Sequence, residues 1–138
     1  MTASRLKRRI AYWQKVLGLG SWEISLSEHP ADEESLATTH TDGKTRQAAL
    51  CFKPGTPDGQ YDRLIVHELT HVLLMDCRIP FQEAVETRGA EARHILDQAY
   101  ERGEEFACER LAMALTGIER VEFGYDVPAP WRHVSLVR

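Results

Sequence analysis

The chain has 138 residues, of which 43% are hydrophobic and 28% are charged, and its formal net charge is -4 at pH 7. This length and composition are typical of a globular protein with its own core, and they argue against a disordered chain. The negative charge gives no general attraction to nucleic acid or to an anionic membrane surface. We therefore expect a single domain over residues 1–138, with neither a membrane nor nucleic acid as its partner.

Three cysteines, Cys51, Cys77 and Cys108, form an odd set without a CxxC pair. Such a set indicates neither a disulfide framework nor a cysteine-rich zinc ribbon, and it fits a reducing compartment. No apolar run approaches the roughly 18 residues of a membrane span, and the basic N-terminal stretch is not followed by the apolar segment of a secretion signal. We expect a cytoplasmic protein.

The first fifty residues predict a helix followed by a small sheet. Apolar residues first recur at helical spacing, and then alternate with polar residues as they do in half-buried strands. Asp42-Gly43 is a typical hairpin turn, so we expect the sheet to be mostly antiparallel. The predicted elements are a helix over about 3–17, a strand over 22–27, and a hairpin formed by 37–41 and 45–53.

The second half predicts two long helices after a break rich in proline and glycine over 54–59. The first helix is apolar on nearly every side, which indicates a central, buried position. The predicted elements are a helix from Tyr61 to about Cys77, ended by Arg78 to Pro80, a partner helix from about Ala90 to Gly117, which Gly103 can kink or divide, and an extended tail over 121–138.

The buried helix carries the motif His67-Glu68-Leu69-Thr70-His71. Two histidines four residues apart project from one face of a helix, close enough to bind the same zinc ion. A glutamate next to the first histidine lies beside the metal-bound water, where it can take a proton as the nucleophile forms. The motif predicts a zinc site with His67 and His71 as ligands and Glu68 as the catalytic base.

The alternative is that His67 and His71 are structural residues and that Glu68 is a surface carboxylate. That interpretation places three polar groups, without a metal, in the most apolar helix of the chain. Burying such groups without compensation is costly. The metal site is therefore the better explanation of the motif.

A catalytic zinc site needs a third protein ligand and an open coordination position. The candidates are Glu104 and Glu105 in the partner helix. Helical periodicity places Glu105 on one face with Cys108 and Glu109, and it places Glu104 on one face with Cys108 and Leu111. Spacing alone therefore leaves both carboxylates as possible third ligands.

Cys77 is a rival third ligand, because it follows His71 by six residues, where the metzincin pattern HExxHxxGxxH has its last histidine. Position 74 is leucine where that pattern has glycine, so Cys77 is better explained as a core residue at the helix end. Cys51 and Cys108 are also expected in the core. The histidines without ligand spacing are His29, His40, His94 and His133. The candidates for polarising the scissile carbonyl are His94, Tyr100 and Tyr125.

The segment from Asp62 to Leu74, with its HExxH motif, resembles the small zincin-type metallopeptidases of phage, prophage and other mobile elements. The resemblance extends to the order of elements from about residue 5 to 117. It implies an α+β, zincin-like minimal domain in which a partner helix carries the third ligand and substrate lies along the sheet edge. It also implies a protein of the cytoplasm of a bacterial or phage-infected host cell.

The segment from Glu105 to Leu115 is similar to the Glu-x-x-Ala-Asn-x-Phe-Ala-x-x-Leu helix of the repressor-cleaving metallopeptidases of mobile elements. This resemblance implies that Glu105 is the third zinc ligand. It also implies that Glu109 orients a metal-binding histidine through a hydrogen bond. The chain departs from the pattern at Cys108, where the family has alanine, and at Glu109, where it has asparagine.

Together these observations predict a metallopeptidase that hydrolyses peptide or protein substrates. One Zn²⁺ ion is bound by His67, His71 and Glu105, and Glu68 is the general base. The alternative is a non-catalytic, zinc-stabilised module that binds a phage or host protein. A third hypothesis is a DNA-associated protein that uses the basic stretch 5–9, and it predicts binding that weakens steeply with salt.

Overall fold

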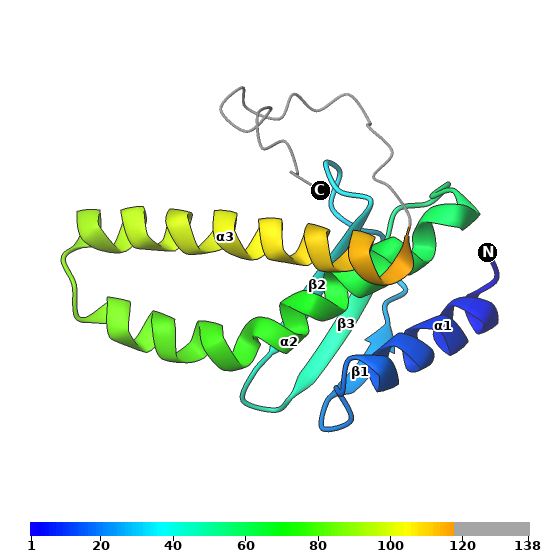
Figure 1. The fold of residues 1–138 in the computed structure, drawn as a ribbon, viewed down its shortest axis with the longest axis horizontal. Helices are drawn as coiled ribbons and strands as arrows, with labels where there is room; N and C mark the ends of the chain where they lie inside the picture. The colour runs from blue at the N-terminus through cyan, green and yellow to red at the C-terminus, as the bar shows by residue number, and fades with distance from the viewer. Residues whose placement is uncertain (118–138) are drawn as a thin grey trace.

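The computed structural model describes residues 1–117 and combines three helices with a three-stranded sheet (Figure 1). In chain order the elements are α1 (Ala3–Val16), β1 (Glu23–Leu26), β2 (Ala37–Asp42), β3 (Gln47–Phe52), the 3-10 turn η1 (Asp58–Gln60), α2 (Tyr61–Glu86) and α3 (Ala90–Thr116). The described part of the chain is α+β, as the sequence predicts. The tail over 121–138 lies outside the described residues.

Helix α1 forms where the amphipathic pattern predicts it. Its first turn is capped by Thr2, whose hydroxyl accepts a hydrogen bond from the amide of Arg5. Its apolar stripe of Leu6, Ile10 and Trp13 is buried. Just beyond the helix, Gly18 adopts a φ of 70°, a left-handed conformation that favours glycine and ends the helix.

The sheet has the order β1-β3-β2, so the central strand is the last in sequence. Strand β2 pairs with β3 in antiparallel register, but β1 pairs with β3 in parallel, with Glu23 opposite Gln47. The sheet is therefore mixed, and the predicted mostly antiparallel sheet is wrong for β1. The physical reason is the connection over 27–36, which carries the chain from one edge of β3 to the other.

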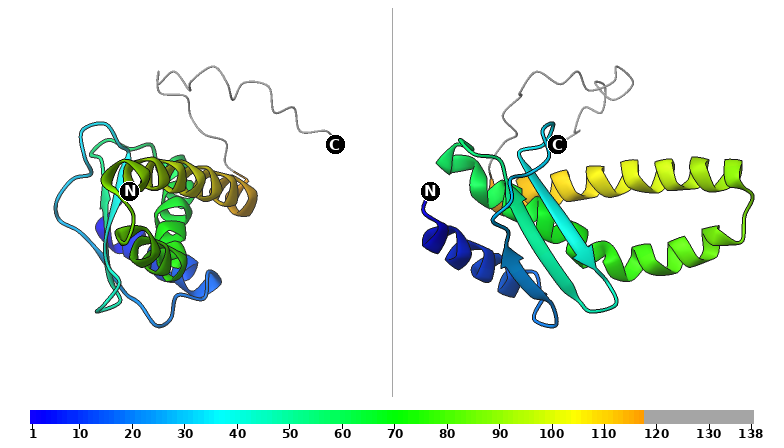
Figure 2. Two further views of the ribbon diagram at one scale, coloured as in Figure 1. Left: turned by 90° about the vertical axis from the view of Figure 1, so that its left-hand side faces the viewer. Right: turned by 180° about the vertical axis from the view of Figure 1, so that it is seen from behind.

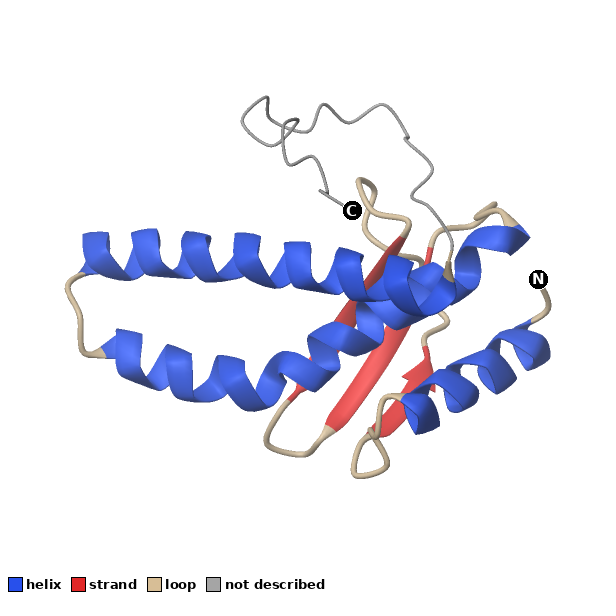
Figure 3. Ribbon diagram, viewed as in Figure 1, coloured by secondary structure: helices blue, strands red, loops and turns tan. Residues whose placement is uncertain are grey.

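Helix α2 continues through Pro80 to Glu86, so the predicted end at Arg78 to Pro80 is wrong. A proline inside a helix removes one backbone hydrogen bond and bends the helix. The bend in α2 is visible in Figure 3. The turn after it packs against α3, because the ring of Phe81 stacks on Tyr100 with centroids 4.5 Å apart and Val85 is buried.

Helix α3 runs back along α2, and both extend past the sheet as a two-helix arm, which we define as residues 77–86 and 90–103 (Figures 1 and 2). The predicted division at Gly103 is wrong, because α3 is one continuous helix. A single glycine costs a helix only about 1 kcal/mol relative to alanine. The helix ends at Gly117, whose φ of 64° is left-handed, as predicted.

The main core lies where the three helices cover one face of the sheet (Figure 2). Its largest fully buried side chains come from the central strand and from the first half of α2: Leu50, Ile65, Val66, Leu69 and Val72. Cys51 and Cys108 are buried, as predicted, but Cys77 is exposed. Because α2 does not end near Cys77, this residue is not at a buried helix terminus. No helix within residues 1–117 is both long and apolar enough to cross a lipid bilayer.

Truncating Leu50 should destabilise the fold strongly. Leu50→Ala removes a side chain with no exposed surface from the middle of β3, so the free energy of unfolding should fall by about 2–5 kcal/mol. Val16→Ala is the control, because Val16 is half exposed and its loss should change stability by about 0.5 kcal/mol or less. Chemical denaturation of both variants measures the difference, and equal effects would contradict the assigned core.

Candidate metal centre

Three side chains from two helices converge on one point beside the sheet. His67 and His71 lie one turn apart on α2, and their Nε2 atoms are 3.3 Å from each other. Glu105 of α3 reaches both, with Oε2 at 3.3 Å from Nε2 of His67 and Oε1 at 3.2 Å from Nε2 of His71. The ligand atoms of the three residues all lie within 4.8 Å of one another, so this group could hold a metal ion.

The donor set of this cluster fits zinc. Two imidazole nitrogens and one carboxylate are a common set of protein ligands in catalytic zinc sites, which keep a fourth position open. The side chain of Glu105 is 61% exposed, whereas His67 and His71 are 15% and 20% exposed. The cluster is therefore anchored in the body on the α2 side and accessible to solvent on the α3 side.

Each histidine has a second carboxylate on its other ring nitrogen. Nδ1 of His67 lies 3.1 Å from Oε2 of Glu109, and Nδ1 of His71 lies 3.3 Å from Oε1 of Glu104. A carboxylate can only accept a hydrogen bond, so each Nδ1 is a donor and each Nε2 is directed to the centre. Such outer carboxylates fix the tautomer and the orientation of a ligand histidine.

Two arginines complete these contacts. Arg63 donates from Nη1 to both oxygens of Glu109, at 2.9 and 2.8 Å, and Arg78 donates from Nη1 to Oε2 of Glu104 at 3.1 Å. The sequence analysis identified neither arginine. Arg63 could have been noticed, since it is a charged residue inside the most apolar helix, and it is buried. Nothing local in the sequence singles out Arg78.

The geometry separates the two candidates for the third ligand. Successive helical residues point about 100° apart, so Glu105 faces the Nε2 atoms while Glu104 faces the Nδ1 atom of His71. Both oxygens of Glu104 are already engaged, by His71 and by Arg78. Within residues 1–117, the group that could hold a metal includes Glu105 and not Glu104.

The other predicted candidates lie away from this cluster. Cys77 is exposed and belongs to no metal-binding group within residues 1–117. His94 and Tyr100 lie in the two-helix arm, where His94 contacts Gln98 and Tyr100 stacks on Phe81. His29 and His40 also belong to no such group in that range. Tyr125 and His133 lie outside the described residues.

Glu68 lies about 100° around α2 from its neighbour His67, and its side chain contacts the sheet. It is 5% exposed, and its Oε2 accepts a hydrogen bond of 2.7 Å from the hydroxyl of Thr39 in β2. Burial raises the pKa of Glu68, and the nearby His67 and the Thr39 hydrogen bond act against that rise. Glu68 is thus a buried carboxylate with a raised pKa beside the candidate metal ligands.

The metal-free histidines are strongly basic. Burial lowers the pKa of His67, but hydrogen bonds to Glu105 and Glu109 outweigh it and raise the pKa to about 9. Burial also lowers the pKa of His71, but contacts with Cys108 and Glu105 raise it to about 11. The same two histidines hold the pKa of Glu105 well below its usual range. The carboxylates around the two imidazoles therefore favour their protonated forms when no metal is bound.

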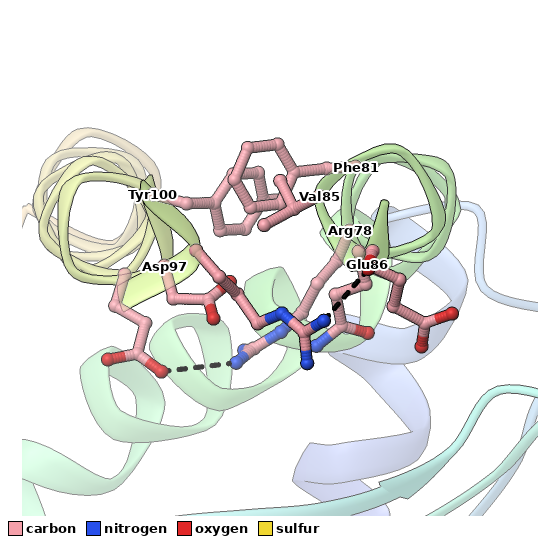
Figure 4. Close-up of a pocket in the computed structure, with 9 residues that line it drawn as sticks. Arg78, Phe81, Val85, Glu86, Asp97 and Tyr100 are labelled. Carbon is pink, nitrogen blue, oxygen red and sulfur yellow. Dashed lines mark hydrogen bonds and ion pairs between the residues drawn. The ribbon is translucent and has the colours of Figure 1, made fainter. Parts of the chain in front are cut away.

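Two hollows lie elsewhere on the molecule. One, of about 350 Å³, lies in the two-helix arm, where Arg78, Phe81 and Tyr100 are part of its lining (Figure 4). The other, of about 410 Å³, lies over the strands, where Ser25 and His40 are part of its lining. Neither is lined by His67, His71 or Glu105, so the chemistry is assigned from the ligand geometry and not from cavity size.

Comparison with known proteins gives no assignment: no family model, no curated protein and no solved structure matches this chain. The resemblance to zincin-type metallopeptidases therefore remains a prediction that rests on the HExxH segment and the Glu105 helix. The function has to be argued from the residues of the centre.

Metal uptake should release protons. Because His67 and His71 have pKa values of about 9 and 11 without a metal, and zinc binds only the neutral imidazole, binding at pH 7 must displace close to two protons. The apparent zinc affinity should therefore rise as the pH is raised from 6 to 8. Isothermal titration calorimetry in buffers of different ionisation enthalpy counts the protons, and uptake without proton release would contradict the assignment of both ligands.

Proposed function

We propose that this protein is a zinc-dependent peptidase with a zincin-like arrangement of its site. His67, His71 and Glu105 bind one zinc ion, and Glu68 is the general base. The observation that carries the proposal is the placement of Glu68, a buried carboxylate next to the ligand His67 and fixed by Thr39. A histidine pair used only to stabilise the fold would not need a buried carboxylate there, because burying it is costly.

The chemistry of peptide hydrolysis assigns a task to each side chain. Zinc, when bound, lowers the pKa of a coordinated water molecule and polarises the substrate carbonyl. Glu68 takes the proton that the attacking water loses and delivers it to the leaving amine. Its raised pKa suits both steps, because a base and acid works best when its pKa approaches the working pH.

The position of β2 supports an extended peptide as the substrate. Strand β2 is an edge strand, paired with β3 on one side. The backbone amide of Lys53 donates to the carbonyl of Leu36 at 2.8 Å. Because hydrogen-bonded pairs alternate along an antiparallel ladder, the backbone groups of Thr39 point away from β3, toward an edge that no other strand of residues 1–117 covers. A peptide added as a further strand there would run past Glu68, and its backbone hydrogen bonds would tolerate many sequences.

A second candidate is a non-catalytic, zinc-stabilised module that binds another protein. It is favoured by the exposed apolar side chains on α3, since Ile95 and Phe106 are 58% and 51% exposed and such residues can mark an interaction surface. In this case Glu68 has no chemical task. The module needs only the fold, and removal of the metal with a chelator or by His67→Ala would unfold it.

Replacing the general base should separate metal binding from catalysis. Glu68→Gln retains the size of the side chain but cannot take a proton, so zinc should stay bound one to one while the rate of peptide cleavage falls by about 10²–10⁴-fold. Zinc is measured by atomic absorption and cleavage of a peptide library by mass spectrometry. Glu83→Gln is the matched control, because Glu83 is an exposed glutamate of the arm and its replacement should leave cleavage unchanged.

If Glu68→Gln cleaves peptides as fast as the wild type does, Glu68 is not the general base and the peptidase assignment is wrong. The second candidate predicts a different set of results. Neither the wild type nor any variant cleaves a peptide, Glu68→Gln binds a partner protein as the wild type does, and His67→Ala unfolds.

The hydrogen bond from Thr39 should control the pH profile. That bond lowers the pKa of Glu68 against the effect of burial. Thr39→Val removes the hydroxyl, so the pKa of Glu68 rises and a larger share of the enzyme is protonated and inactive in mild acid. The acidic limb of kcat/KM should move to higher pH while the zinc content stays constant. A limb that stays in place or moves to lower pH would show that Glu68 is not the titrating base.

A further inference from the structure

Arg78 links the metal centre to the two-helix arm. It follows His71 by two turns of α2 and is directed across to α3 (Figure 4). There Nη1 donates to Glu104 at 3.1 Å, and Nη2 lies 3.5 Å from Oε1 of Glu101. The same side chain lines the hollow of the arm. Arg78 thus lies where α2 leaves the body and the arm begins.

Glu104 is the group through which Arg78 reaches the centre. Its side chain is 3% exposed, and it divides its oxygens between the two neighbours, Oε1 to His71 and Oε2 to Arg78. A buried carboxylate is tolerated only when its charge is compensated. Arg78 provides a positive partner for Oε2, which leaves Oε1 of Glu104 directed to the Nδ1 atom of His71.

His67, the other candidate ligand histidine, is held by a similar series of contacts, and these lie outside the two-helix arm. Arg63, with its side chain 5% exposed, holds Glu109 through two hydrogen bonds, and Glu109 accepts from His67. Arg63 is itself fixed by Gln60 at 3.0 Å. The sequence resemblance anticipated a role of this kind for Glu109 alone. The contacts of Arg78 and Glu104 repeat the arrangement, but their anchor is the arm.

We propose that Arg78 and Glu104 are positioning residues that set the orientation of the His71 imidazole for metal binding, and that the centre's affinity for zinc therefore depends on the arm. Glu104 fixes the tautomer that leaves Nε2 free as a ligand. Arg78 fixes Glu104 by connecting it to the first residues of the arm. The inference rests on the metal centre of the proposed function and does not require peptidase activity.

The test compares metal binding by the full chain with and without each contact. Glu104→Gln removes the negative charge at nearly constant size, and Arg78→Met removes the guanidinium but keeps most of the aliphatic stem. Each variant should bind zinc about 10–100-fold more weakly than the wild type, which is the usual effect of losing an outer partner of a metal ligand. The visible absorption of bound Co²⁺, which reports coordination geometry, should change as well.

Arg93→Met is the matched control, because Arg93 lines the same hollow but donates to the carbonyl of Glu86 at 2.8 Å instead of to Glu104. It should change neither the zinc affinity nor the Co²⁺ spectrum. Arg78→Lys, which keeps the charge, should recover part of the affinity lost in Arg78→Met. Because both residues act on His71 in series, the double variant should lose little more than the weaker-binding single variant.

Zinc affinities within about twofold of the wild type for both Arg78→Met and Glu104→Gln, or an equal loss in Arg93→Met, would overturn the inference. If Arg78→Met fails to fold by circular dichroism, Glu104→Gln and Arg78→Lys decide in the same way. The outcome is distinct from that of the proposed function. A wild type that binds zinc and cleaves nothing refutes the peptidase, whereas equal zinc affinity across these variants refutes only the role of Arg78 and Glu104.

Discussion

Around the candidate metal centre, charged side chains form the contacts between α3 and α2, and further along the two helices the Phe81–Tyr100 stack adds an apolar contact. Within the described residues, the buried apolar side chains of α3 are Cys108 and Ala112, whereas its glutamates face the histidines and arginines of α2. Contacts of this kind require accurate geometry, because a buried charge that loses its partner is strongly destabilising. Electrostatic complementarity between α3 and α2 therefore helps to set the position of Glu105.

Helix α2 distributes its side chains so that the two halves of the chemistry meet. His67 and His71 share the face toward α3, while Glu68, about 100° further around the helix, faces Thr39 of the edge strand. The candidate metal ligands thus come from two helices, and the proposed base lies on α2 and contacts the sheet. A substrate would lie between these surfaces, which explains why neither hollow elsewhere on the molecule is needed for the chemistry.

The charges of the candidate metal centre are balanced in the metal-free structure. Two imidazolium groups offset the charge of Glu105 when no metal is bound, as the raised pKa values of His67 and His71 indicate. A divalent ion then replaces two protons, so the net charge enclosed between α2 and α3 stays nearly constant. The fold consequently does not have to absorb a large change in charge when the metal enters or leaves.

The features of the fold and the candidate site that depend on local sequence patterns could be predicted from the sequence, whereas those that depend on contacts between distant segments could not. The HExxH helix is a local pattern, so His67, Glu68 and His71 were identified without a structure. Helical spacing alone did not choose between Glu104 and Glu105, because the two differ by one helical position. The family resemblance favoured Glu105, and the docking of α3 places Glu105 in the group that could hold a metal. The parallel pairing of β1 has no local signal.

Two local rules were outweighed by tertiary contacts and intrinsic helix preference. The bend at Pro80 did not end α2, since the following turn packs on α3. Gly103 did not divide α3, because one glycine is a small cost in a long helix. The sequence did not predict a role for Arg78, because its contacts with Glu101 and Glu104 form only when α2 and α3 pack together.

The two-helix arm lies, in sequence, between the second histidine and the glutamate of the metal centre. An ion bound by both His71 and Glu105 would link the two ends of the chain segment that contains the arm, and so close it into a loop. The entropy of closing a loop grows slowly with its length, by roughly 0.6 kcal/mol for each doubling. The tip of the arm, beyond the Phe81–Tyr100 stack and the buried Val85, could therefore be shortened or lengthened by matched helical turns at a small cost in loop-closure entropy.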